Sequence, residues 1–196
     1  MSNESEQPPG APERPWGERM MDWAKEKVAA EPIVGETGAA SGVLTSQEEP
    51  ETPEDALPPI DFAKDKREFD EFPLHAVLGL TLQELRPGYA RICLATSKVT
   101  LGGVGGSVHG GLLAAMVDIA MLEALVPLLR RGERTAGTVD LNITYLRPAL
   151  GTQVYAEATV LRKGRTTVVT EVSITDGAGR LCAKGRTIYA LRQETA

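Results

Sequence analysis

Residues 102–118, GGVGGSVHGGLLAAMVD, combine a glycine-rich loop, the tripeptide His109-Gly110-Gly111 and an apolar stretch with one carboxylate, Asp118, nine residues after the histidine. The first N–H groups of a helix have no partner inside the helix and lie at the positive end of its dipole, so they can polarise a carbonyl group. A carboxylate held on an apolar helix can act as a base or as a nucleophile. The pattern therefore predicts a reaction in which an oxyanion develops.

The charged residues of this stretch allow more than one interpretation. A lone charge on an apolar helix costs several kcal/mol to bury unless it is paired, so Asp118 is interpreted as catalytic, with a satisfied core or interface carboxylate as the alternative. Glu123 lies about 140° further round the helix and is interpreted as an interface or rim charge. His109 and His75 are the only histidines, and neither has a carboxylate cluster at ligand spacing, so no metal site is predicted. We expect His109 to position the backbone rather than to transfer a proton.

Composition sets the class of protein. The chain has 196 residues, is 42% hydrophobic and carries a net charge of −6, which fits one globular domain with extra sequence and disfavours nucleic-acid binding. Cys93 and Cys182 lie in apolar segments and are predicted to be buried, reduced thiols. The polar N-terminus has no signal-like apolar stretch, and the apolar run 110–129 contains two acidic residues, which are costly in lipid. We therefore expect a cytoplasmic protein without a membrane span.

The chain has two regions of different character. Nine of the 13 prolines fall in the first 59 positions, and residues 1–58 are predicted to be a low-complexity, largely disordered extension. Residues 15–31, which hold both tryptophans, form the exception. They are either a transient amphipathic helix or a docking or lid segment. The folded domain is predicted over residues 61–192.

The folded region predicts helices, then a hairpin, a long helix and more strands. A helix over 61–72, stopped by Pro73, precedes a short helical turn and two strands around the turn Arg86-Pro87-Gly88. The long helix is expected over 110–131, ended by the basic segment 130–134. Residues 138–145 alternate, with apolar side chains at Val139, Leu141, Ile143 and Tyr145, which predicts a strand with one packed and one solvated face.

Three further strands are expected at 154–162, 166–175 and 180–192, and short turns would make the last four strands an antiparallel meander. A helix that is apolar almost all round needs a curved sheet wrapped around it, and a second copy of the chain could cover the remainder. The sequence therefore predicts an α+β domain that oligomerises.

Three motifs carry a resemblance to a known family: HGGLLAAMVD (109–118), TVDLNITYLRP (138–148) and LRKGRT (161–166), in this order. Over about residues 73–192 the chain resembles the hotdog-fold acyl-CoA thioesterases of the phenylacetate-pathway (PaaI-like) branch. The resemblance implies a curved antiparallel sheet of five to six strands around one long helix. It also implies hydrolysis of acyl-CoA without a metal or redox cofactor, at an active site shared between subunits of a homodimer or homotetramer.

The resemblance also assigns roles to residues of the site. Asp118 is the expected catalytic carboxylate, which activates water or attacks directly. The Gly110 N–H is expected to polarise the thioester carbonyl, His109 to shape the loop, and Thr138 to orient water or substrate. Gly111 is expected beside them in the substrate site.

Basic residues near the end of the motif region are candidates for binding the coenzyme A phosphates. Arg162, Lys163 and Arg165 cluster at a turn, and cationic side chains favour phosphate, although a solvated turn is the alternative. Arg147 is a further candidate.

The chain departs from the family at Gly103, where related enzymes often carry an asparagine that helps to hold water or the thioester. Ser107 is the nearest polar residue. A non-catalytic acyl-CoA-binding module is therefore an open alternative. A hotdog dehydratase acting on 3-hydroxyacyl thioesters fits the motif less well, and the sequence leaves the acyl group open.

Overall fold

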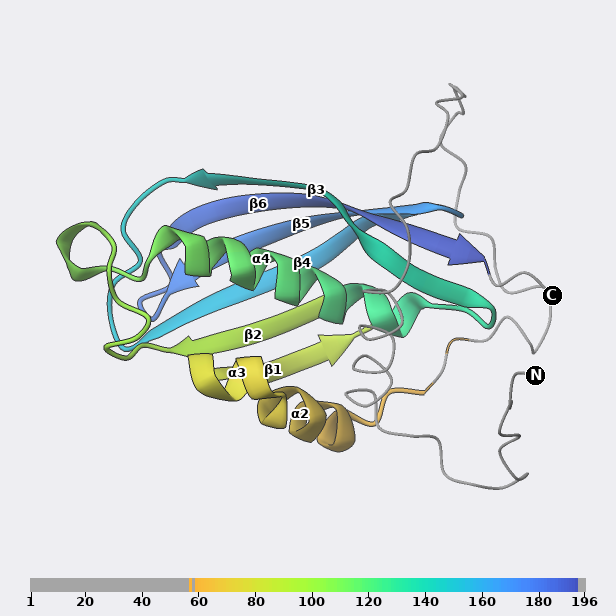
Figure 1. The fold of residues 1–196 in the computed structure, drawn as a ribbon, viewed down its shortest axis with the longest axis horizontal. Coiled ribbons are helices and arrows are strands. Elements are labelled where there is room, and N and C mark those ends of the chain that lie inside the picture. Colours follow the sequence, from red (N-terminus) through yellow and green to blue (C-terminus); the bar gives the residue numbers. More distant parts are fainter. Residues whose placement is uncertain (1–56, 58, 194–196) are drawn as a thin grey trace, which may run out of the picture. The chain divides into compact units, whose positions relative to one another are not determined.

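The computed structural model describes residues 57 and 59–193, which lie in the second of the two units into which the chain divides, residues 47–196. Apart from Leu57, the extension predicted over 1–58, with its helix at 15–31, lies outside the described residues. The elements are, in chain order, α2 (Phe62–Glu71), α3 (Pro73–Leu78), β1 (Leu80–Arg86), β2 (Tyr89–Ala95), the 3-10 turn η2 (Val104–Gly106), α4 (Gly110–Leu125), the 3-10 turn η3 (Val126–Leu128), β3 (Glu133–Tyr145), β4 (Gln153–Lys163), β5 (Thr167–Asp176) and β6 (Leu181–Gln193). The predicted architecture, six antiparallel strands and one long helix, is confirmed (Figure 1).

The order of the strands differs from the predicted meander. The sheet runs β1-β2-β4-β5-β6-β3, so β3 pairs with β6 at the far edge and not with β4, its successor in the chain. Among the last four strands, only β4, β5 and β6 follow one another as hairpins. The prediction was wrong because the seven residues 146–152 between β3 and β4 form a longer connection than a tight hairpin turn, and α4 carries the chain across the sheet before β3 begins.

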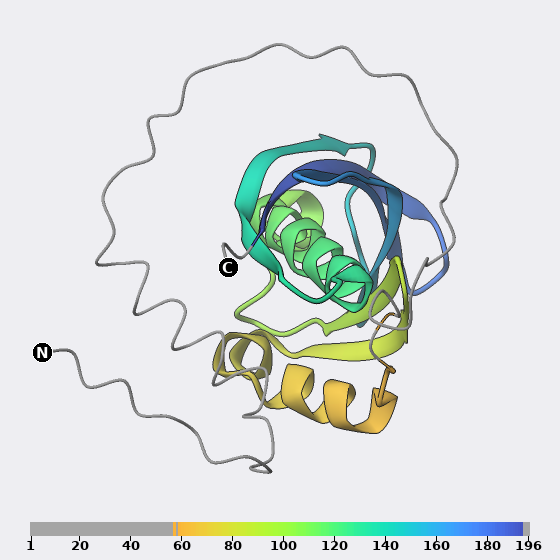
Figure 2. The ribbon, with the colours of Figure 1, turned by 90° about the vertical axis from the view of Figure 1, so that its right-hand side faces the viewer.

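Helix α4 lies against the inner face of the sheet, which curls around it (Figure 2). The side chains of α4 that are buried are Leu113, Met116, Val117, Ala120, Met121, Ala124 and Leu125. Gly185 of β6 permits a close approach, because a Cβ there would lie 2.6 Å from Cγ1 of Val117. Leu112, Ile119 and Leu122 on the opposite side of α4 remain partly exposed. One chain thus covers this apolar strip of the helix only in part, as the sequence predicts.

The long helix is a core helix, and its C-terminal end lies earlier in the chain than predicted. The segment Gly110–Leu128 is long and apolar enough to cross a bilayer, but its buried face packs on the sheet as a core helix does. The α-helix ends at Leu125, six residues before the predicted end. Pro127 has no N–H to continue the helix and lies instead in the 3-10 turn. β3 starts at Glu133, five residues earlier than predicted, because its first residues pair with the end of β6.

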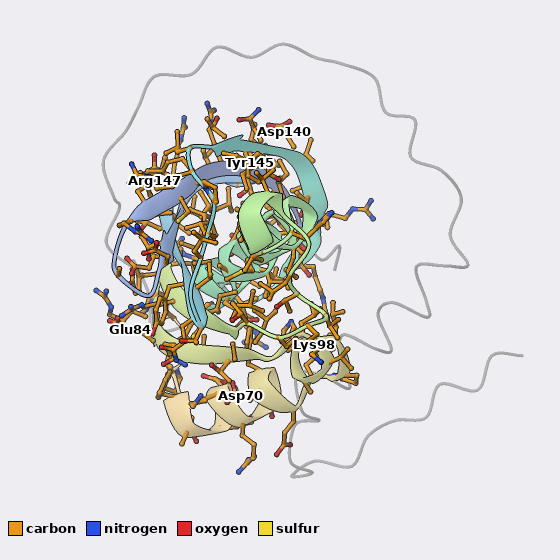
Figure 3. The ribbon with its side chains drawn as sticks, turned by 90° about the vertical axis from the view of Figure 1, so that its left-hand side faces the viewer. Asp70, Glu84, Lys98, Asp140, Tyr145 and Arg147 are labelled. Atoms are coloured by element: carbon orange, nitrogen blue, oxygen red, sulfur yellow. The ribbon has the colours of Figure 1, made fainter. Side chains whose placement is uncertain are left out.

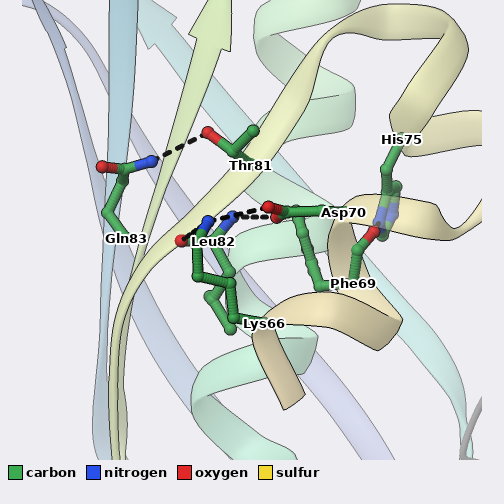
Figure 4. A network of polar contacts seen from close by, with 7 residues as sticks. All are labelled: Lys66, Phe69, Asp70, His75, Thr81, Leu82 and Gln83. Carbon is green, nitrogen blue, oxygen red and sulfur yellow. Dashed lines mark hydrogen bonds and ion pairs between the residues drawn. The ribbon is translucent and has the colours of Figure 1, made fainter. Parts of the chain in front are cut away.

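The two edges of the sheet differ in whether their backbone groups are covered. Helix α2 covers β1: Asp70 Oδ1 accepts the Leu82 N–H at 2.8 Å, and Lys66 Nζ donates to the Leu82 carbonyl at 2.8 Å (Figure 4). The same lysine pairs with Asp70 Oδ2 at 2.7 Å. These side chains occupy backbone groups that another strand would need. Within residues 57 and 59–193, the 13-residue strand β3 pairs with β6 alone, so its outer edge is open.

Glu123 makes the stability of this domain depend on pH. Burial, followed by the charge of Asp65, raises the pKa of Glu123 to about 8 from its usual 4.5. The unfolded chain releases this proton above about pH 4.5 and the folded chain keeps it until about pH 8, so the free energy of unfolding falls as the pH rises between these values.

We expect Glu123→Gln to remove this fall in the free energy of unfolding with rising pH. The stability gained over the unaltered chain should grow between pH 5 and pH 8, by at most about 1.4 kcal/mol per pH unit. Urea unfolding at the two pH values measures it, and Glu71→Gln, at an exposed position, is the matched control. An equal gain at pH 5 and pH 8 would contradict the assignment.

Candidate active site

The first turn of α4 leaves one backbone donor available. His109 is the N-cap, and its Nδ1 accepts the Gly111 N–H at 3.1 Å. The His109 carbonyl accepts the N–H groups of Leu112 and Leu113 at 2.9 and 3.2 Å. Among residues 57 and 59–193, the Gly110 N–H has no such acceptor, so it is free to bind an oxyanion at the positive end of the helix. The Gly111 N–H, by contrast, is used by the cap.

Tyr145 of β3 closes over this turn (Figure 3). Its hydroxyl donates to the Gly110 carbonyl at 2.8 Å, and a Cβ on Gly110 would lie 3.4 Å from two carbons of its ring. The alternation in 138–145 placed Tyr145 on the packed face, but it did not mark the residue as part of a site. The available signal was its position at the end of a strand predicted to face the helix.

Asp118 pairs with Thr138 on the neighbouring strand. The Thr138 Oγ1 donates to Asp118 Oδ1 at 2.7 Å. Asp118 is only partly buried, beside the edge strand of the sheet. Two of the predicted site residues therefore come together, and the threonine hydroxyl fixes one carboxylate oxygen while the other remains available for chemistry.

A β-bulge brings Thr138 to the helix. Thr138 pairs with Tyr189 and Asp140 pairs with Ile188, so Val139 is an extra residue in β3. The bulge interrupts the alternation at this point: Val139, predicted on the packed face, is 67% exposed, whereas Leu141 and Ile143 pack against the core as predicted. Thr138, predicted on the solvated face by the alternation, is exposed and also contacts Asp118, while Asp140 points outward (Figure 3).

Tyr189 is a neighbour of Asp118 that the sequence did not indicate. It lies opposite Thr138 in the register and is buried. Burial raises the pKa of Tyr189 above its usual value; a hydrogen bond with Thr135 opposes the rise, and the charge of Asp118 adds to it. The tyrosine therefore stays neutral beside the carboxylate.

The loop before His109 cannot hold, in this conformation, the asparagine that the resemblance leads us to expect at position 103. Gly102 and Gly103 both donate to the Ser107 carbonyl, at 3.2 and 2.9 Å. A Cβ at Gly103 would collide with Ser107 Oγ and lie 2.6 Å from the Val108 carbonyl oxygen. Glycine is therefore a steric requirement of this tight turn, and Ser107 is buried beneath it.

The basic turn after β4 contains one engaged and two exposed cations. Lys163 Nζ donates to both carboxylate oxygens of Glu133, at 2.7 and 2.6 Å, and its side chain is only 19% exposed. It joins the end of β4 to the start of β3. Arg162 and Arg165 are exposed.

This turn lies at the opposite end of α4 from Gly110. Val160, just before the turn, donates to the Gly88 carbonyl at 2.8 Å, and Gly88 donates to the carbonyl of Ala124 in the last turn of α4 at 3.1 Å. Arg147, which is exposed, follows Tyr145 at the Gly110 end (Figure 3). Within one chain, the structure therefore does not bring the basic turn to the free N–H.

Gly110 and Asp118 also cannot act together within one chain. They are eight residues apart on one helix, which places them roughly 12 Å apart along its axis. A carbonyl held about 3 Å from the Gly110 N–H would be out of reach of the Asp118 carboxylate.

Metal-ligating side chains do not gather in the described part of the chain. Within it, no three His, Cys, Asp or Glu side chains form a group that could hold a metal ion. Cys93 and Cys182 are both buried and unpaired. The two carboxylates of α4 also do not come together, since Glu123 and Asp118 lie on different sides of the helix. Of these two, only Asp118 accepts a hydrogen bond from β3.

Three comparisons place this geometry among known proteins. The family model described as "Thioesterase superfamily" matches residues 105–183. Human acyl-coenzyme A thioesterase 13 is 39% identical over 113 residues, which cover 56% of this chain and 79% of the relative. The zebrafish thioesterase superfamily member 2 structure matches with a TM-score of 0.59 and 29% identity, over 67% of this chain and 99% of that one. A Bacillus halodurans protein crystallised with CoA gives a TM-score of 0.54 and 25% identity, over 66% and 82% of the two chains.

Proposed function

Because this chain belongs to the thioesterase superfamily and has its hotdog fold, we propose that it is a hydrolase that cleaves acyl-CoA thioesters to a free acid and coenzyme A. The observation that carries the proposal is the first half of α4, with a free Gly110 N–H at its start and Asp118, oriented by Thr138, further along. The name of the human relative and the CoA in the Bacillus structure support the substrate class.

The active site is formed by two chains. Within each helix the two groups are roughly 12 Å apart. A two-fold axis that places Asp118 of one chain opposite Gly110 of the other brings a donor and a carboxylate from different chains together. The open edge of β3 and the exposed strip of α4 support a homodimer through this side, since α2 covers the β1 edge. Assembly of two dimers into a homotetramer stays a prediction.

The reaction follows from these groups. The thioester oxygen accepts the Gly110 N–H, which is worth about 10²–10³ in rate for one such donor. Asp118 of the second chain takes a proton from water as the water oxygen adds to the carbonyl carbon. The C–S bond then breaks, the carbonyl re-forms as the acid, and the sulfur leaves with the proton as the coenzyme A thiol. Direct attack by Asp118, which gives an anhydride that water hydrolyses, is the alternative.

Arginines contact the coenzyme A phosphates in this proposal. If the β3 edges pair antiparallel about the two-fold axis, the Glu133 end of one strand lies beside the Tyr145 end of the other. Arg162 and Arg165 then approach the Gly110 end of the partner chain, where Arg147 also lies. Lys163 supports this turn through Glu133 instead of binding phosphate. Gly111, exposed and without a side chain, leaves room for the substrate.

A thiol-release assay over short-chain, long-chain and aryl acyl-CoAs tests the function. We expect stoichiometric release of coenzyme A thiol and free acid. Saturable acyl-CoA binding without thiol release would establish the alternative, a binding module, which Gly103 favours. An enoyl product from a 3-hydroxyacyl-CoA would indicate a dehydratase. The cytoplasmic location stays a prediction, consistent with two unpaired thiols.

A substitution at His109 separates positioning from proton transfer. The Oδ1 of asparagine occupies nearly the same place as the Nδ1 of histidine, and asparagine is a favourable N-cap. We therefore expect His109→Asn to retain kcat within about threefold, whereas His109→Ala loses the cap to Gly111 and at least tenfold in kcat. Steady-state kinetics measure both variants. Equal losses in the two would show that the histidine ring itself takes part in the chemistry.

A further inference from the structure

One peptide unit in the first turn of α4 is held at both of its ends by side chains. The unit that joins Gly110 to Gly111 consists of the Gly110 carbonyl and the Gly111 N–H. Tyr145 donates its hydroxyl to that carbonyl at 2.8 Å, and His109 Nδ1 accepts that N–H at 3.1 Å. The cap is local, whereas Tyr145 comes from 35 residues further along the chain.

Two successive glycines make such support necessary. Glycine has the largest backbone freedom and lowers helix stability by about 1 kcal/mol relative to alanine, so a Gly-Gly start frays readily. The proposed oxyanion donor, the Gly110 N–H, belongs to the preceding peptide unit and shares the Gly110 Cα with the clamped one. Rotation about this Cα would swing the donor away from the thioester oxygen, where errors of a fraction of an ångström reduce catalysis.

The bonds around Gly110 oppose that rotation on both sides. The preceding unit is held through the His109 carbonyl, which accepts from Leu112 and Leu113 at 2.9 and 3.2 Å. The following unit is held by Tyr145 and His109. The only group of the two units left without a partner among the described residues is the Gly110 N–H itself.

Tyr145 is itself fixed by the sheet. It is the last residue of β3 and pairs with Ala183 of β6. The next two residues, Leu146 and Arg147, both donate to the Cys182 carbonyl, at 2.8 and 3.1 Å. The tyrosine therefore ties the start of the helix to a strand, and the same strand carries Thr138, which orients Asp118.

We propose that Tyr145 is a positioning residue that sets the direction of the Gly110 N–H through its hydrogen bond to the Gly110 carbonyl. This inference rests on the proposed thioesterase function. Tyr145 is not a catalytic residue, because its hydroxyl is used by the backbone. Tyr145 is 51% exposed beside the site, so contact between its ring and the substrate is a separate effect that the test must distinguish.

The substitution Tyr145→Phe keeps the ring and removes only the hydroxyl. We expect kcat to fall roughly five- to tenfold, the effect of one neutral hydrogen bond, with KM and the inhibition constant of coenzyme A unchanged. The matched control is Tyr155→Phe, which removes a hydroxyl of β4 that bonds to Gln153 at 3.0 Å, and it should leave kcat unchanged. An unchanged kcat in Tyr145→Phe, or a rise in KM alone, would overturn the inference.

A double substitution distinguishes positioning from a general loss of stability. In a Gly110→Pro background, which has no N–H to direct, Tyr145→Phe should have no further effect on kcat, while additive losses would overturn the inference. Amide hydrogen exchange measured by NMR gives a readout that does not need turnover. The Gly111 amide should exchange faster in Tyr145→Phe and at the original rate in Tyr155→Phe, and equal exchange rates in the two would overturn the clamp. Absence of thiol release by the unaltered chain would instead count against the proposed function alone.

Discussion

Replacement of Asp118 by asparagine is expected to lower kcat for thioester hydrolysis by about 10²- to 10⁴-fold, the range for loss of a general base. The amide has nearly the same shape, and its oxygen can still accept the hydrogen bond that Thr138 donates at 2.7 Å. It can neither take a proton from water nor attack the carbonyl carbon. Acyl-CoA should therefore bind with the original affinity and remain uncleaved.

Single-turnover thiol release, together with the Kd of a non-hydrolysable acyl-CoA thioether, measures chemistry and binding separately. The matched control is Asp140→Asn, because Asp140 is an exposed carboxylate on the outer face of the strand that carries Thr138. It should turn over at the original rate. Thiol release by Asp118→Asn at the rate of the unaltered chain would exclude the carboxylate from the reaction.

The first turn of α4 could be predicted from the sequence because its geometry is local. A histidine followed by two glycines and an apolar run specifies an N-cap and a helix start, and the structure places His109, Gly110 and Gly111 in those positions. The spacing to Asp118 then follows from the helical rise alone. Six strands and one long helix were also predictable, because turn residues and local apolar patterns mark strands and helices.

The features that were mispredicted depend on residues distant in the sequence. The bulge at Val139 exists because β3 pairs with β6, and alternation within 138–145 contains no information about that partner. The position of β3 at the sheet edge is set in the same way. Lys163 resembled a phosphate ligand until Glu133, 30 residues earlier, was found to bind it. The role of Tyr145 likewise depends on a carbonyl 35 residues away.

Gly110→Pro removes the proposed oxyanion donor with little other change. Proline has no N–H, it is favourable at the first helical position, and His109 already has the extended backbone (φ −61°, ψ 133°) that a residue before proline prefers. We expect kcat to fall about 10²- to 10³-fold. Gly110→Ala, which keeps the N–H and whose Cβ would lie 3.4 Å from the Tyr145 ring, is the matched control and should retain most activity.

Chains carrying Gly110→Pro and Asp118→Asn should restore activity to each other when they are co-expressed with different tags. Each site takes its donor from one chain and its carboxylate from the other, so at equal amounts about one quarter of the sites contain both intact groups. We therefore expect about one quarter of the original kcat per site in the unseparated mixture and about one half in mixed dimers purified through both tags, far above either variant alone. Purified mixed assemblies that stay as inactive as the single variants would show that each chain builds its own site, because in that arrangement every site carries one of the two defects. Recovery would instead establish that the N–H and the carboxylate meet across a subunit boundary, as their separation of roughly 12 Å along one helix requires.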